Sequence, residues 1–330
     1  MKTNTDIKII DYLTKNKQAT AKELVAYLGI SKQALFKSHL LKLLQEEKIK
    51  KIGKSPKVFY LLKETEKKDE ISADFMKANE IIQKIIGKRY LIITSNGERK
   101  EGLEGFIYWC NKNKLSAVKT AIEYIKTLGK YDKFRKDGFI EGIKKLKDTF
   151  KETYLDKLFY LDFYSIERFG KTKLGQLLLY AKQTQDKKMI RELIDEIKPE
   201  VIKLIEKYKI DGIGFIPPTI KRETQFMREL ESGLNLNVKG IKITKVKTEV
   251  IVPQKSLSKL KDRVENIKKT LIVEEKSIHN NILLIDDAVG SGSTMNETAK
   301  QIREKKICRG KIIGFSITGS FKGFDVISEV

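Results

Sequence analysis

The chain has 330 residues, of which 40% are hydrophobic, so it can form about two or three domains with real cores and is not wholly disordered. Lysine and arginine number 67 against 44 acidic residues, which gives a net charge of +23 and favours polyanionic partners. Because lysine is abundant throughout and proline is scarce, a general compositional bias explains this charge equally well.

Composition also excludes several kinds of site. Cys110 and Cys308 are the only cysteines, so neither a disulfide framework nor a four-cysteine zinc site can form. His39 and His279 are the only histidines; His39 lies on the apolar side of an expected helix, where we expect it to be packed, and we expect no dedicated metal site. No apolar run approaches the roughly 20 residues of a membrane span, and no secretory signal is evident, so we expect no membrane partner and a cytoplasmic location.

Residues 1–65 carry the pattern of three helices followed by a hairpin. Thr20 and Glu23 form a capping-box pattern at the start of the second helix, Gly29 ends it, and Ser31 begins the third. Two strand-like runs, IKKIG and KVFYLL, then flank the turn at 53–56.

Residues 5–63 resemble a winged helix-turn-helix, with the turn LGIS between a capped helix and a second helix that has polar residues at its front. In that family the second helix enters the DNA major groove, where glutamine can bond adenine and lysine can reach guanine or phosphate. The resemblance implies duplex DNA as a partner, contacted by Ser31, Lys32, Gln33, Lys37, Lys54 and Lys57. A winged helix used for protein contact or dimerisation is the alternative, so a homodimer stays open.

Residues 66–185 are expected to form a mostly helical middle domain of unknown role. Helical spacing runs through segments such as EIIQKIIGK and SAVKTAIEYIKTLGK, with a strand and a turn in YLIITSNGE. The stretch LFYLDFYSIERFGKTKLG is aromatic first and basic after. It suggests either a nucleic-acid platform with Lys171 and Lys173 on phosphate or a packed core, and we favour the core. GKTKLG lacks the spacing of a P-loop.

Residues 186–330 alternate helix and strand, which predicts a parallel α/β sheet. KKMIRELIDEIKPEVIKLIEKYKI is expected to be helical but broken near Pro199. In NNILLIDDAVGSGSTMNETAKQIRE, the run ILLI is typical of a strand buried on both faces. Asp286 and Asp287 follow at its carboxyl end, and a loop of small residues, expected from Ala288 to Thr294, opens a helix.

This last segment combines two kinds of ligand-binding group. Backbone N–H groups at a helix start carry partial positive charge and bind phosphate, and ligands of open sheets bind at the carboxyl ends of strands. Acidic residues beside such a loop repel a phosphate, so we expect them to bind a different group of the ligand. Two carboxylates can accept hydrogen bonds from a vicinal diol, which is what a ribose 5-phosphate would offer.

The segment resembles the PRPP-binding signature of type I phosphoribosyltransferases. The resemblance implies that Asp286 and Asp287 bind the ribose hydroxyls. It also implies that the 5′-phosphate is bound by the loop, at Ala288, Gly290, Ser291, Gly292, Ser293 and Thr294.

Two further stretches, FIPPTIKRETQFMRELESGLNL and VIVPQKSLSKLKDRVENIKKTL, are similar to segments of the ComF family. The first would contact pyrophosphate through Pro218, Thr219, Lys221 and Arg222. The second would supply a mobile basic loop that closes over the site, with candidates Lys255, Lys259 and Arg263. Asp286, Asp287, Lys221 and Arg222 are the catalytic candidates, and Mg²⁺ would arrive with PRPP rather than occupy a protein site.

The chain is therefore expected to be a multidomain α/β protein, with a winged helix at 1–65, a helical domain at 66–185 and a phosphoribosyltransferase fold at 186–330. We favour a PRPP-binding, ligand-responsive DNA-binding regulator. An active phosphoribosyltransferase that displaces pyrophosphate and a ComF-like role in DNA uptake are the alternatives. The phosphate loop holds no acid that could serve as general base, and no base-recognition segment is evident, so the acceptor is not identified.

Overall fold

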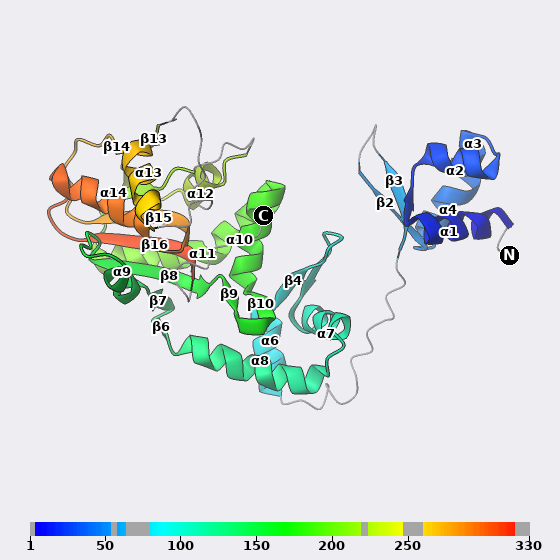
Figure 1. Ribbon diagram of the computed structural model, residues 1–330, viewed down its shortest axis with the longest axis horizontal. Coiled ribbons are helices and arrows are strands. Elements are labelled where there is room, and N and C mark those ends of the chain that lie inside the picture. The colour runs from blue at the N-terminus through cyan, green and yellow to red at the C-terminus, as the bar shows by residue number, and fades with distance from the viewer. Residues whose placement is uncertain (1–3, 54–57, 64–79, 219–223, 247–259, 321–330) are drawn as a thin grey trace. The chain divides into compact units, whose positions relative to one another are not determined.

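The computed structural model describes residues 4–53, 58–63, 80–218, 224–246 and 260–320 (Figure 1). The chain divides into two compact units, Met1–Ser72 and Ala73–Val330. Each unit is described by itself below.

The first unit contains the expected helices and hairpin around its own core. Its helical elements are α1 (Asn4–Asn16), α2 (Ala21–Leu28) and a continuous third segment made of α3 (Lys32–Ala34), the π-helical η1 (Leu35–Leu40) and α4 (Leu41–Gln45). An antiparallel sheet has the order β1-β3-β2, formed by β1 (Gln18–Ala19), β3 (Phe59–Leu62) and β2 (Ile49–Ile52).

The helix ends of this unit follow the predicted capping chemistry. Thr20 and Glu23 form a complete capping box at the start of α2, and Gly29 ends that helix in the left-handed region at φ 65°. Ser31 caps the next helix by accepting a hydrogen bond from the Ala34 amide at 3.1 Å. Residues that are neighbours in sequence are therefore sufficient to set the boundaries of these helices.

His39 is part-buried, but it has a charged partner that the sequence did not indicate. Its Nδ1 lies 2.7 Å from a carboxylate oxygen of Asp6, which is 2% exposed. The Lys42 ammonium contacts the other Asp6 oxygen at 2.8 Å. A buried carboxylate needs such compensation, so Asp6 links α1 to the third helical segment.

The second unit is built on a seven-stranded mixed sheet in which the central strands are parallel. The order is β12 (Lys239–Gly240), β11 (Gly212–Phe215), β15 (Ile282–Val289), β16 (Ile312–Gly319), β8 (Lys157–Phe163), β7 (Phe139–Glu141) and β6 (Arg135–Lys136). The pairs from β12 to β8 are parallel, while β7 and β6 are antiparallel.

The expected division near residue 185 does not separate two folds. Strands β6, β7 and β8 all come from 135–163, inside the stretch expected to be a helical domain, and β8 pairs directly with β16. The run LFYLDF is rich in aromatic residues, which are enriched in strands, and pairing with β16 fixes it as one. Residues of the middle stretch therefore complete the sheet of the C-terminal part.

Helices cover both faces of this sheet (Figure 1). One face packs against α10 (Lys173–Thr184), α11 (Lys187–Tyr208) and α12 (Phe226–Leu234). The other packs against α9 (Ile143–Thr149), α13 (Leu260–Thr270) and α14 (Ser293–Glu304). Leu283 and Ile285 belong to the first core and Ile282 and Leu284 to the second, all at 0% exposure. The prediction that ILLI is buried on both faces is confirmed.

The rest of the unit contains further helices and hairpins. Their bounds are α6 (Glu80–Arg89), β4 (Leu91–Ile93), β5 (Arg99–Glu101), α7 (Gly102–Lys112), α8 (Ala117–Asp132), β9 (Ser165–Ile166), η2 (Glu167–Phe169), β10 (Gly170–Lys171), β13 (Ile243–Lys245) and β14 (Leu271–Val273). The ring of Tyr131 on α8 packs against Phe163, where β8 ends, with centroids 5.0 Å apart. Helix α8 therefore lies beside the carboxyl end of β8.

The predicted break near Pro199 is wrong. Helix α11 runs without interruption from Lys187 to Tyr208, with Pro199 inside it. Proline removes one helical hydrogen bond, but Ile197 and Val201 on either side of it are fully buried. The continuous apolar stripe against the sheet outweighs the missing bond.

The aromatic run forms core, as favoured. Tyr160, Phe163 and Tyr164 are buried, and Lys173 pairs with Glu196 rather than facing an open platform. Both cysteines are buried and free, and burial raises the pKa of the Cys110 thiol to about 11. Among the described residues, no helix combines the length and apolar character needed to cross a membrane.

Candidate functional site

The two adjacent acids lie at the carboxyl edge of the sheet, within strand β15. Asp286 is paired in register with Ser316, and the strand continues through Ala288 and Val289, which pair with Thr318 and Gly319 of β16. The loop is therefore shorter than expected. Only residues 290–292 connect strand to helix, because 288 belongs to β15 and 293–294 belong to α14.

The acids have different electrostatic surroundings. The Asp287 carboxylate accepts a hydrogen bond from the ammonium of Lys182, which α10 brings to the sheet edge. The pKa of Asp286 is raised to about 7, chiefly by burial and secondly by the negative charge of Asp287. The positive charges of Lys182 and Lys245 oppose this rise. The edge thus holds one carboxylate paired with an ammonium and one that titrates near neutrality.

Three lysines at this edge were not identified from the sequence. Besides Lys182, β13 contributes Lys245, whose pKa is lowered by burial while Asp286 opposes that shift. Helix α9 contributes Lys145, which donates to Ser320 just past the end of β16. No local signal could have found them, since each lies at least 41 residues along the chain from Asp286, Asp287 or Ser320, its partner at this edge, in a chain with lysine throughout.

The small-residue loop is closely packed. Gly292 has φ 79°, a backbone conformation that favours glycine, and a Cβ there would clash with the end of the Leu146 side chain from α9. Ser291 and Ser293 are buried, with their hydroxyls 3.1 Å apart, whereas Gly290 and Thr294 are part-exposed. Gly292 provides no side-chain cap for α14, but the Ser293 amide, the first of this helix, donates to the Ser291 hydroxyl at 3.4 Å.

The stretch expected to contact pyrophosphate begins beside the acids. The Ile216 amide donates to the Ile285 carbonyl at 2.8 Å, and Pro218 then faces solvent. On the far side, the Thr224 amide donates to the Gln185 side chain at 2.7 Å, directly after α10. Helix α10 therefore contacts both the acid pair and the end of this stretch.

Several predicted residues lie outside the described part of the chain. These are Thr219, Lys221, Arg222, Lys255 and Lys259 at the candidate ligand site, and Lys54 and Lys57 in the first unit. The backbone position of Arg263 falls within α13, but its side chain is not described.

In the first unit, the remaining predicted DNA-contacting residues share one exposed surface segment. Ser31, Lys32, Gln33 and Lys37 are all exposed along the third helical segment. The Ser31 oxygen already caps that helix. Lys32, Gln33 and Lys37 are therefore the predicted contact residues whose exposed side chains do not cap this helix.

The chain matches no family model and no curated protein. It is similar in part to a hypoxanthine-guanine phosphoribosyltransferase from Bacillus anthracis, with 14% identity over 39% of this chain and 65% of that one, and a TM-score of 0.24. A hypoxanthine phosphoribosyltransferase from Staphylococcus aureus shares 13% identity over 42% of this chain and 82% of that one, with a TM-score of 0.23. These TM-scores are too low to support an argument, so the proposals below rest on this chain's own residues.

Proposed function

We propose that this protein binds PRPP at the carboxyl edge of its sheet and acts as a ligand-responsive DNA-binding regulator. The observation that carries the PRPP proposal is the placement of Asp286 and Asp287 at the end of β15, two residues before the glycine-serine loop that leads into α14. Vicinal ribose hydroxyls would donate to the carboxylates. The 5′-phosphate would accept from the first amides of α14, where the helix dipole favours negative charge.

The charges at this edge suit such a ligand. Without ligand, the Lys182 ammonium compensates Asp287, and a proton with a pKa near 7 compensates Asp286. Lys145, Lys182 and Lys245 would then offer positive charge to the phosphate groups. We propose that Mg²⁺ enters bound to the pyrophosphate.

The PRPP proposal is tested by replacing both acids with the neutral isostere. Calorimetric titration with PRPP and Mg²⁺ should show binding to the natural chain and at least about 100-fold weaker binding to Asp286→Asn with Asp287→Asn, because two charge-assisted hydrogen bonds are lost. Asp195→Asn, an exposed acid of α11, is the matched control. Equal affinity in the acid variant and the control would refute the site.

The DNA-binding half of the proposal rests on the first unit. Its helical segments, its three-stranded antiparallel sheet and the exposed Lys32, Gln33 and Lys37 support this half of the proposal, in which these three side chains would reach bases or phosphates. Ligand binding can regulate DNA affinity only if PRPP has different affinities for two states. Such coupling is typically about 5- to 150-fold.

Fluorescence anisotropy with labelled duplex DNA tests this half on the full chain. Lys32→Ala with Gln33→Ala should weaken DNA binding at low salt. Lys15→Ala removes the same charge from an exposed position of α1 and should weaken DNA binding less. PRPP with Mg²⁺ should change the affinity. Equal DNA affinity in both variants, or no DNA binding by the natural chain at low salt, would exclude the regulator proposal.

An active phosphoribosyltransferase is the second candidate. It is favoured by the consecutive order of strand, acid pair, loop and helix, which a regulator has less need to retain. The reaction would break the bond between ribose C1 and pyrophosphate, and the edge lysines would stabilise the departing charge. Pyrophosphate release measured with a panel of bases and amines should rise above the rate with PRPP alone if this candidate is correct.

A further inference from the structure

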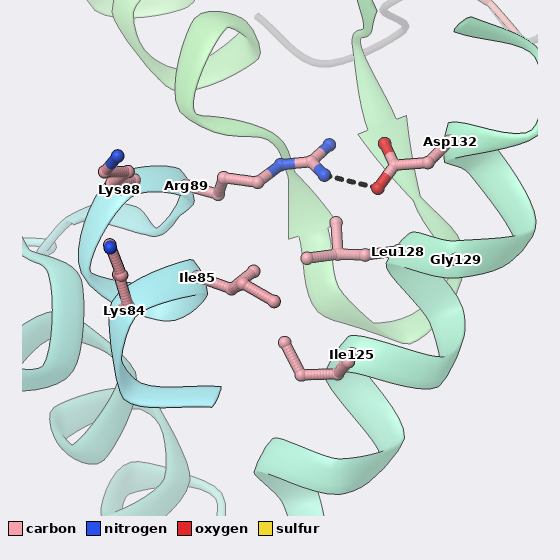
Figure 2. A pocket seen from close by; sticks show the side chains of 8 residues that line it. All are labelled: Lys84, Ile85, Lys88, Arg89, Ile125, Leu128, Gly129 and Asp132. Carbon is pink, nitrogen blue, oxygen red and sulfur yellow. Dashed lines mark hydrogen bonds and ion pairs between the residues drawn. The ribbon is translucent and has the colours of Figure 1, made fainter. Parts of the chain in front are cut away.

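A cavity of about 440 Å³ lies between helices α6 and α8, within the second unit (Figure 2). Ile85 from α6 faces Ile125 and Leu128 from α8 across it, which makes the interior apolar. At one end the Arg89 guanidinium crosses the gap to the Asp132 carboxylate at 2.6 Å. The volume is that of a small-molecule site, and it is too small for a folded partner.

The charged groups around this cavity are unbalanced. Lys84, Lys88 and Arg89 line it together with a single carboxylate, Asp132. Lys84 and Lys88 are four residues apart on exposed turns of α6, and like charges at this spacing repel each other. In the described part of the chain, neither ammonium has an ion-pair partner. The cavity mouth therefore favours an anion.

Gly129 keeps the cavity open. It lies inside the 16-residue helix α8, where glycine is less favourable than alanine. Its φ is not in the left-handed region, and no described atom lies within 4 Å of where its Cβ would be. Neither backbone geometry nor packing among the described residues requires glycine here. The missing side chain leaves space at a position that lines the cavity.

We infer that the α6–α8 cavity binds a small amphiphilic anion: a compact apolar or aromatic group that enters between Ile85 and Leu128, carrying a carboxylate, sulfonate or phosphate that meets Lys84 and Lys88. An acidic head suits the two lysines, whereas a cationic head would add to their repulsion. The site is separate from the carboxyl-edge acids, so it adds a second small-molecule site to the chain.

The probe is 8-anilinonaphthalene-1-sulfonate, an aromatic anion whose fluorescence rises in apolar sites. Gly129→Leu should lower its affinity at least about tenfold by filling the cavity, while leucine favours the helix, so the variant should keep or raise its Tm. Lys84→Gln with Lys88→Gln should lower affinity about fivefold. Lys119→Gln with Lys126→Gln removes the same charge from exposed α8 positions outside the cavity and should leave affinity unchanged.

The head-group charge is tested by competition. Decanoate, decanol and decylammonium each have ten carbons and differ in their head groups, and decanoate should displace the probe best. Probe binding that is equal in Gly129→Leu and the natural chain would overturn the site. Displacement by decylammonium as good as by decanoate, or equal loss in the two lysine pairs, would overturn the anion preference. PRPP affinity should be the same in Gly129→Leu, which separates failure here from failure of the PRPP proposal.

Discussion

Asp286→Asn should make this protein more stable at alkaline pH while it removes a proposed ligand-binding group. The pKa of Asp286 is raised from 3.8 to about 7, chiefly by burial, so the folded chain keeps a proton that the unfolded chain releases between these values. Stability therefore falls as pH rises from about 4 to about 7. A shift of about 3 units at 1.36 kcal/mol each sets an upper limit of about 4 kcal/mol.

Asparagine has no proton to lose in this range, so the variant should not show that fall. At pH 8 we expect it to exceed the natural chain by about 1–4 kcal/mol, and at pH 4 the two should be nearly equal. Urea unfolding followed by the fluorescence of Trp109, the only tryptophan and part of α7 in the second unit, measures this unit directly. Asp195→Asn should show the pH dependence of the natural chain. A variant that is no more stable than the natural chain at pH 8 would refute the burial argument.

Three smaller predictions address the edge and the first unit. Lys182→Gln removes a cation that favours the ionised form of the acids, so the pKa of Asp286 should rise further, and PRPP titrations at a series of pH values should show a higher midpoint. Gly292→Ala combines a left-handed backbone with a clash on Leu146 and should lower unfolding free energy by at least about 2 kcal/mol in urea. Thr20→Ala loses the capping box and should cost about 1 kcal/mol, seen as faster amide hydrogen exchange in α2.

Much of the local structure could be predicted because it depends on neighbours in sequence. A capping box needs only residues three apart, and the Gly97 turn between β4 and β5 needs only a residue that accepts φ 76°. ILLI shows its burial by having no polar position. The acid pair and Gly292 could also be predicted from local sequence, because the strand, the acids, the loop and the helix are consecutive in the chain.

Where the sequence-based expectations failed, distant packing decided the outcome. Pro199 predicted a break, but α11 continues because its apolar stripe is held on the sheet from both sides. The stretch 135–163 was expected in a helical domain, yet pairing with β16 makes β8 a strand of the main sheet. Asp6 was given no role, although it is buried and binds both His39 and Lys42.

The amino-acid sequence by itself determined which residues form the strand, the acid pair and the bend, because these lie within one short segment. Only the tertiary structure decided the charge state of that edge. Lys182 is 105 residues from its carboxylate partner, and Lys145 and Lys245 come from two other elements. Coulomb energy and burial depend on distance in space, and helix α10 brings its lysine to the acids by packing against the sheet.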